Sequence, residues 1–318
     1  YAYTDALQFA GPLQTALREM TGWRAREYWF PEIRSTGGAI LVFSAVLYPY
    51  VYLLARAAFL EQSANLMQAG RLMGRGAWGA FWRVALPLAR PAIAAGTSLA
   101  LMETLADFGA VSYFGVQTFT TGIYRAWLSM GDSVAAAQLS AVLLGVVVLI
   151  LVFEHRSRGQ ARFHDVAAPG QVRRVELRGL PAAAAAVACA VPPLLGFLVP
   201  AGILLHVVST EPEPLLTVRF IGLARNTFAL AAVTSLAAVL VATLLAYAAR
   251  LSASRVVAAA NRLASLGYAI PGAVIAVGIL LPLGRLDNLI ADWARAQFGI
   301  SIGLVFTGSI AALVYAYL

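Results

Sequence analysis

The chain contains no lysine, since all 23 of its basic residues are arginine. A phosphate-binding loop of the Walker A type needs a lysine to reach the nucleotide phosphates. Its absence therefore excludes an ordinary ATP site in this chain, and it excludes a lysine Schiff base as well. The single cysteine, Cys189, permits neither an internal disulfide nor a cysteine-rich metal site. It lies in an alanine- and valine-rich run, which favours simple packing.

Charge is also scarce. Only 12% of the 318 residues are charged, 60% are apolar, and the mean hydropathy is +0.77. A soluble domain is about a quarter charged, so this composition predicts an integral membrane protein. Basic residues are not interleaved with aromatics outside the apolar runs, which disfavours nucleic-acid binding. Long apolar runs approach or exceed the roughly 20 residues that cross a bilayer as a helix; we predict spans at 36–56, 91–113, 134–153, 181–209, 226–249, 263–283 and 301–318.

The arginines predict the orientation of these spans. If the spans alternate, the side that holds residues 61–90 carries fourteen arginines and the opposite side carries nine. Cytoplasmic loops are enriched in basic residues, so the 61–90 side is predicted to be cytoplasmic. Six of the fourteen lie in 154–180, which we interpret as a solvated linker between two parts of the chain.

The most unusual stretch is 61–96, which lies between two apolar runs and carries Arg71, Arg75, Arg83 and Arg90. We predict a short helix, a glycine-rich turn, and a second helix that ends at Leu86-Pro87, because proline blocks helix continuation. Residues with little or no side chain let a short helix approach another protein closely. An amphipathic helix on lipid headgroups is the alternative. The spaced pattern consists of Gln68, Ala69, Gly70, Gly74, Val84, Leu86 and Pro87.

This spacing resembles the EAA loop of permease subunits of binding-protein-dependent ABC importers, in which the loop docks on an ATPase. Gln68 replaces the glutamate of that pattern, Gly70 the second alanine, and Val84 the isoleucine. Residues 101–133 resemble the fused-half ferric iron (Fe3+) permeases of this class. The resemblance implies an all-α, polytopic, MetI-like helical bundle in a bacterial inner membrane. It also implies that the chain is a transport subunit, not an enzyme, that moves ferric iron inward.

The same resemblance implies partners: an ATP-binding cassette ATPase dimer that carries ATP-Mg, a periplasmic substrate-binding protein, and membrane lipid. No cofactor is expected in this chain. Related permeases carry thiamine, sulfate or polyamines, so these solutes stay open. An ion-coupled secondary transporter is a further alternative, for which a helix break at Pro271-Gly272 is the one hint.

Two homologous halves are expected. A weak repeat relates the segment that begins at Gly38 to the one that begins at Gly308. We therefore predict the C-terminal part of a first half over 1–153 with its coupling loop at 61–96, the arginine-rich linker at 154–180, and the N-terminal part of a second half over 181–318. Because the chain starts without Met and ends in an apolar run, we interpret it as a fragment that stops before a second coupling loop.

Two further groups are candidate site residues. Glu103 and Asp107 are interpreted as the only carboxylates well inside an apolar span, four residues apart and therefore on one helix face. They either line a cation pathway or form a structural pair, with Asp107 capping a broken helix near Gly109. They do not resemble a tight metal site. Loop 115–133 contains Tyr124, Arg125 and Trp127, which either receive the binding protein or form an interfacial aromatic belt.

Overall fold

The computed structural model describes residues 1–24, 27–62, 76–158, 176–210, 217–252 and 254–318. In these ranges every regular element is a helix. Six helical segments of the described ranges are long and apolar enough to cross a membrane, and each overlaps one of the seven predicted spans, all but the last. The prediction of an all-α membrane protein is thus confirmed. The chain divides into two compact units, which are described separately: Tyr1–Thr118 with Gly145–Thr210, and Phe119–Leu144 with Glu211–Leu318.

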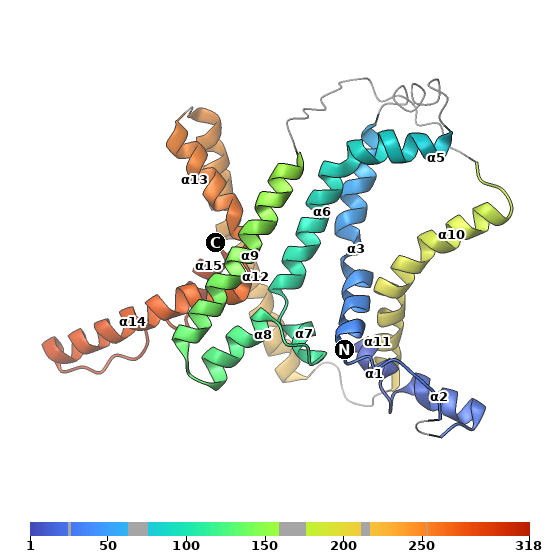
Figure 1. The fold of residues 1–318 in the computed structure, drawn as a ribbon. Coiled ribbons are helices and arrows are strands. Elements are labelled where there is room, and N and C mark those ends of the chain that lie inside the picture. Colours follow the sequence, from blue (N-terminus) through green and yellow to red (C-terminus); the bar gives the residue numbers. More distant parts are fainter. Residues whose placement is uncertain (25–26, 63–75, 159–175, 211–216, 253) are drawn as a thin grey trace. The chain divides into compact units, whose positions relative to one another are not determined.

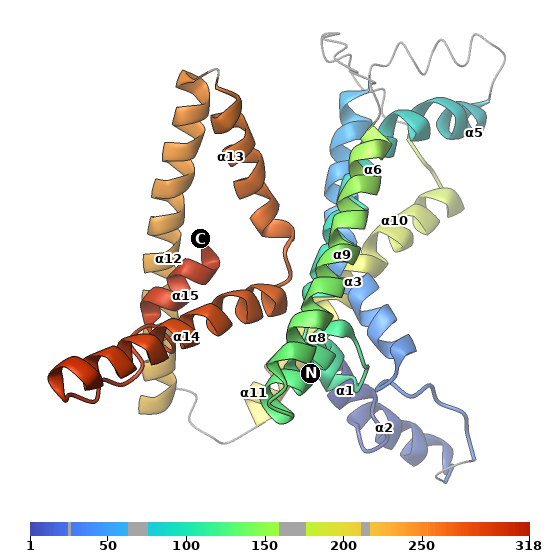
Figure 2. The same ribbon diagram turned by 60° about the vertical axis from the view of Figure 1, so that its left-hand side comes forward.

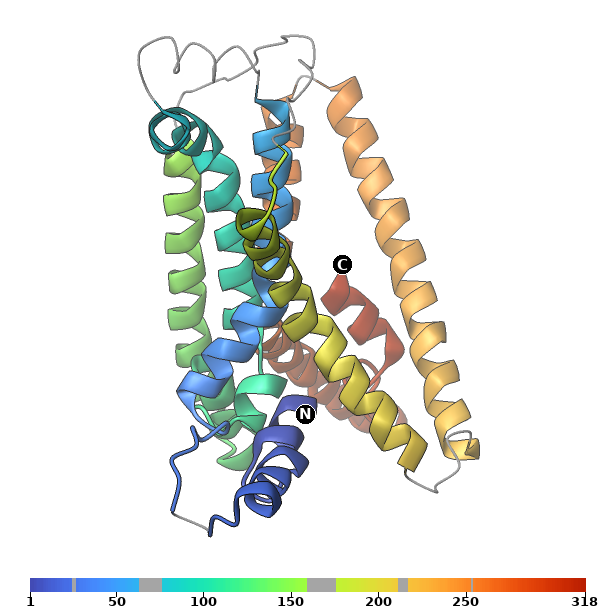
Figure 3. The same cartoon turned by 90° about the vertical axis from the view of Figure 1, so that its right-hand side faces the viewer.

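The first unit is built around α3 (Thr36–Glu61) and α6 (Leu86–Ala106), which lie side by side (Figures 1 and 3). Helix α3 begins where the Ser35 hydroxyl accepts a hydrogen bond from the Gly38 N–H at 3.2 Å, a typical N-cap. Around this pair lie α1 (Ala2–Leu7), α2 (Pro12–Thr21), α5 (Ala77–Ala80), α7 (Gly109–Tyr113), part of α9 (Ser133–Arg158), α10 (Leu180–Pro193) and α11 (Val199–Thr210).

Helices α10 and α11 form one continuous run, joined by a π-helical turn at Leu194–Leu198 that packs against α3. Glycine makes this approach possible: a Cβ on Gly196 would overlap the carbonyl oxygen of Ala45 in α3. Pro192 and Pro193 lie just before the π-helical turn. A wider turn next to proline is a common way for a helix to accommodate a missing N–H donor.

The second unit contains α8 (Phe119–Tyr124), the start of α9, α12 (Val218–Leu251), α13 (Arg255–Leu266), α14 (Gly272–Phe298) and α15 (Ile310–Tyr317). Figure 2 shows α12 and α13 as a helical hairpin, and α15 packs against both α12 and α14. Helix α13 is amphipathic and begins at Ser254, whose hydroxyl accepts from the Val256 N–H at 3.3 Å.

Four predicted boundaries are wrong. The span 91–113 ends at Ala106, and the loop 115–133 is largely helical. The span 263–283 instead starts at Gly272, after the break predicted at Pro271-Gly272, and continues to Phe298. Residues 301–318 hold only the eight-residue α15. The error at 263–283 arose because hydropathy alone does not separate the amphipathic helix α13 from the span that follows it.

Candidate functional site

The coupling-loop residues fall into two groups. Gln68, Ala69, Gly70 and Gly74 lie outside the described residues. Val84 lies in a π-helical turn at Phe81–Ala85, and Leu86 and Pro87 are the first two residues of α6. The described part of the loop is therefore its second helix and the junction with the following span.

Pro87 does not end this helix, contrary to prediction. The chain is helical without interruption from Ala77 through Ala106, although α5 points across the end of α6 in Figure 1. The Leu86 N–H bonds to the carbonyl of Phe81, five residues back, which defines the π-helical turn directly before the proline. Proline lacks an N–H but is well tolerated in the first turn of a helix. Leu86-Pro87 thus marks the junction between loop helix and span.

The base of the loop is fastened to the end of α3. The Gln62 side chain donates from Nε2 to the carbonyl oxygen of Ala85 at 2.8 Å, across 23 residues of sequence. The rings of Phe59 and Phe81 lie 5.9 Å apart between centroids. Ala85 is 4% exposed, so this contact is shielded from water. Sequence reasoning missed Gln62, because a glutamine at the end of an apolar run carries no pattern of its own.

Two tryptophans on the same segment remain at the surface of the unit. Trp78 is 75% exposed and Trp82 is 61% exposed, and both rings lie edge-on to Phe81. Exposed aromatic side chains beside an arginine, here Arg83, are common at protein interfaces and membrane interfaces. This face of the loop is available for contact with a partner or with lipid.

Helices α3 and α6 are in close contact at Gly96. A Cβ on this residue would lie 2.7 Å from the Cα of Val51 and 2.8 Å from the Tyr50 carbonyl oxygen. Nearby, the Tyr50 hydroxyl donates to Oε1 of Glu103 at 3.4 Å. Small residues allow such close approach of membrane helices, so the pair is held together at its middle as well as at the base of the loop.

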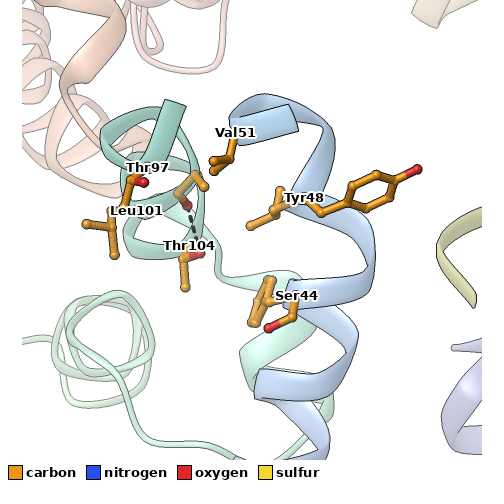
Figure 4. Close-up of a pocket in the computed structure, with 9 residues that line it drawn as sticks. Ser44, Tyr48, Val51, Thr97, Leu101 and Thr104 are labelled. Atoms are coloured by element: carbon orange, nitrogen blue, oxygen red, sulfur yellow. Dashed lines mark hydrogen bonds between the residues drawn. The ribbon is translucent and has the colours of Figure 1, made fainter. Parts of the chain in front are cut away.

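An open groove of about 230 Å³ runs between these two helices. Figure 4 shows residues of both helices along it, with the Thr104 hydroxyl donating to the Ala100 carbonyl and the Tyr48 ring pointing away from α6. The lining is mostly apolar, with hydroxyl groups from both helices; it consists of Phe43, Ser44, Leu47, Tyr48, Val51, Thr97, Ala100, Leu101 and Thr104.

Glu103 and Asp107 do not share a helix face, contrary to prediction. Helix α6 ends at Ala106, and Asp107 has extended backbone. Its carboxylate accepts a hydrogen bond from the Val111 N–H at 2.9 Å, at the start of α7. Asp107 therefore has the capping role that the sequence left open as an alternative, whereas Glu103 remains within the span and bonds Tyr50.

The structure places Tyr124, Arg125 and Trp127 on helix rather than loop. Tyr124 ends α8, and the other two belong to the π-helical turn Arg125–Ser129. Arg125 is exposed, whereas Tyr124 and Trp127 are half-buried. The three residues thus lie together along one short helical segment, and their role in docking stays a prediction.

Asp287 is a carboxylate that sequence reasoning did not place in a span. It lies in α14, is fully buried, and accepts hydrogen bonds from the backbone N–H groups of Val305, Phe306 and Thr307 at 3.1, 2.9 and 2.7 Å. The statement that Glu103 and Asp107 are the only such carboxylates is therefore wrong. The error follows from the misplaced span at 263–283, which left Asp287 in a loop.

Within the described ranges no three His, Cys, Asp or Glu side chains are grouped closely enough to hold a metal ion. The candidate site thus consists of the fastened loop base, the close α3–α6 contact and the groove beside it. Residues 29–158 match the family described as binding-protein-dependent transport system inner membrane component.

This segment of 130 residues, less than half of the chain, is therefore similar to the permease domains of that family. The match covers α3, the loop, α6 and α9, and with the six candidate spans it identifies a multi-pass protein of the inner membrane. No solved structure matches the chain.

Curated relatives agree with the permease family. The chain is 32% identical over 129 residues to the Fe(3+)-transport system permease protein FbpB 2 of Haemophilus influenzae, which covers 40% of the chain and 26% of that relative. It is 29% identical over 121 residues to the molybdenum transport system permease protein ModB of Escherichia coli. This match covers 36% of the chain and 53% of that relative. A probable molybdenum ABC transporter permease of Haloferax volcanii is 32% identical to the chain over 128 residues. This match covers 39% of the chain and 47% of that relative.

The chain thus spans about a quarter to a half of the length of these relatives. All three relatives are named as permeases, which agrees with the prediction of a transport subunit. Their names divide between iron and molybdenum, so the family is supported whereas the predicted iron specificity is not.

Proposed function

We propose that the chain is part of the membrane-spanning permease of an ATP-driven importer for an inorganic ion. The observation that carries this proposal is the permease-family match over residues 29–158, whose described part contains the two spans and the fastened loop base between them. In this proposal a separate ATPase dimer binds the loop on the cytoplasmic side. A periplasmic binding protein delivers the ion to the opposite face.

The chain itself performs no bond chemistry in this mechanism. ATP binding by the partner moves the loop, and the loop moves α3 and α6 between two packings of the spans. ATP binding can shift the spans from one packing to the other only if the ATPase binds the loop more tightly in one packing than in the other. The hydrogen bond from Gln62 and the close contact at Gly96 support such coupling, because they join both spans to the loop.

We favour ferric iron as the substrate and keep molybdate as the second candidate. Iron is supported by the resemblance of residues 101–133 and by the iron-transport relative, molybdate by the two relatives named for molybdenum. Glu103 lies within a span, where a carboxylate suits passage of a cation. The hydroxyl groups of the α3–α6 groove suit an oxyanion.

Coupling is tested by co-purification of the full-length protein with its ATPase. We expect Gly74→Leu to abolish stable association, because its side chain would fill the space that a close-docking helix needs. Gly76→Leu is the matched control, since Gly76 lies outside the family spacing and has no atom near its would-be Cβ. Absence of any ATPase from the wild-type preparation would refute the proposal.

The substrate is tested by uptake into liposomes that contain the full-length protein, the ATPase and the binding protein. Labelled Fe3+ and labelled molybdate are offered in parallel, with ATP and with a non-hydrolysable analogue. ATP-dependent uptake of Fe3+ alone supports iron, and uptake of molybdate alone overturns it. Uptake of neither ion, alongside uptake of another solute, would reject both.

A further inference from the structure

The residues at the two ends of the coupling loop form a double contact. Gln62 follows Phe59 by three positions, and Ala85 follows Phe81 by four, so the ring contact and the hydrogen bond lie close together in sequence on both sides of the interface. Phe59 meets Phe81, and Gln62 bonds Ala85. The apolar contact and the hydrogen bond therefore reinforce each other across the same interface between the end of α3 and the helix that leads into α6.

The surroundings make this interface specific. Ala80 and Ala89 are fully buried and Ala85 nearly so, which places an alanine face of the loop helix inside the unit. Gln62 is half-buried and has extended backbone directly after α3, so its side chain is free to reach across to the Ala85 carbonyl. Ala85 is the N-cap residue of α6, so its carbonyl accepts the Gln62 N–H in addition to the first hydrogen bond of that helix. This second hydrogen bond favours one alignment of the two ends.

We propose that Gln62 is a positioning residue that joins α3 and α6 at the base of the loop, so that the two spans follow loop movement as one body. This proposal rests on the proposed function of the chain as an ATPase-coupled permease. With the bond present, a displacement of the loop reaches both spans together. Without it, the loop shifts relative to α3, and part of the ATP-driven movement is lost before it reaches the spans.

The first test measures coupling in the assembled importer in liposomes, as ions imported per ATP hydrolysed, with labelled Fe3+ and labelled molybdate as probes. We expect Gln62→Ala to lower this ratio by roughly two- to tenfold, the factor that one net hydrogen bond represents. ATP hydrolysis itself continues. Gln62→Glu, which keeps the size but cannot donate, lowers the ratio to a similar extent, and Gln62→Lys, which keeps a donor, restores part of it.

Glu61→Ala is the matched control, since Glu61 is the exposed neighbour at the end of the same helix. A wild-type ratio in Gln62→Ala and Gln62→Glu would overturn the positioning role while leaving the proposed function intact. By contrast, a wild-type protein that binds no ATPase would refute the proposed function itself.

A second test does not depend on the stability of these variants. Cys189 is replaced by alanine, cysteines are introduced at positions 62 and 85, and the pair is joined by a short bismaleimide in the assembled importer. If the two loop ends stay together throughout the cycle, the crosslinked protein imports as well as the same protein before crosslinking. Loss of import on crosslinking, relative to the same double-cysteine protein before crosslinking, would show that the ends must separate and would overturn the proposal, provided that the reagent causes no further loss in either single-cysteine variant.

Discussion

Replacement of Gly96 by alanine is expected to destabilise the first unit through a single methyl group. The new Cβ would lie 2.7 Å from Val51 Cα and 2.8 Å from the Tyr50 carbonyl oxygen. Carbon atoms in good contact are about 3.5–4.0 Å apart. Both neighbours are backbone atoms of α3, so no side-chain rotation relieves the overlap, and the two helices must move apart locally by roughly an ångström.

The expected magnitude follows from two opposing terms. Overpacking of a tightly packed core costs about 1–3 kcal/mol. Removal of a glycine from a helix interior contributes about 0.5–1 kcal/mol in the other direction. We therefore expect Gly96→Ala to lower the free energy of unfolding by about 1–2 kcal/mol. The same separation of α3 from α6 widens the groove and reduces import.

Gly145→Ala is the matched control, because Gly145 also lies within a helix, α9, and no atom lies within 4 Å of its would-be Cβ. This variant retains only the favourable helix term and is expected to be slightly more stable than wild type. The assay is reversible unfolding in mixed detergent micelles, followed by tryptophan fluorescence. Equal stability of the two variants would refute the close α3–α6 contact, and so would a stabilised Gly96→Ala.

Three further changes test other contacts. Asp287→Ala removes the acceptor of three backbone N–H groups and should cost roughly 3 kcal/mol of unfolding free energy, about 1 kcal/mol for each hydrogen bond lost. Asp292→Ala, at an exposed position of the same helix, should be nearly neutral; equal midpoints in detergent unfolding would contradict the assignment. Asp107→Ala should lower the free energy of unfolding by about 1 kcal/mol, because it removes the hydrogen bond that caps α7. Asp107→Asn should keep part of this hydrogen bond. The rate of hydrogen exchange at the Val111 amide measures the loss. Glu103→Gln keeps an acceptor for Tyr50 and should leave the free energy of unfolding within about 0.5 kcal/mol of wild type. If Glu103 lines a cation pathway, the variant takes up less Fe3+ while ATP hydrolysis continues. Unchanged Fe3+ uptake argues for a structural role of Glu103.

The repeat suggested by Gly38 and Gly308 illustrates what a sequence pattern leaves undecided. Gly38 lies in the first turn of α3, where a Cβ would overlap the Ile33 carbonyl. Gly308 lies before the N-cap of α15 and has a φ of 86°. The two glycines are thus required for different reasons, one for close approach and one for a left-handed backbone. The division into two homologous halves stays a prediction.

Helix ends beside apolar runs were the least predictable feature. Hydropathy placed Asp107 inside a span, and the helix-breaking tendency of proline placed Pro87 at the end of a helix. Neither criterion measures which hydrogen bonds the backbone forms. The chain turns at Asp107, where a carboxylate can cap the next helix, and passes through Pro87, where a π-helical turn precedes it. Local pairing of backbone donors and acceptors decided both positions.

Composition and spacing alone determined the class of this protein. The low charge and the long apolar runs indicated a helical membrane protein, and the spacing from Gln68 to Pro87 indicated a resemblance to the permease family. Tertiary structure alone decided which distant residues meet: Gln62 with Ala85, Gly96 with Tyr50 and Val51, and Asp287 with the backbone before α15. The physical reason is that lipid exposure and helix period depend on local sequence, whereas these contacts depend on how separate helices pack.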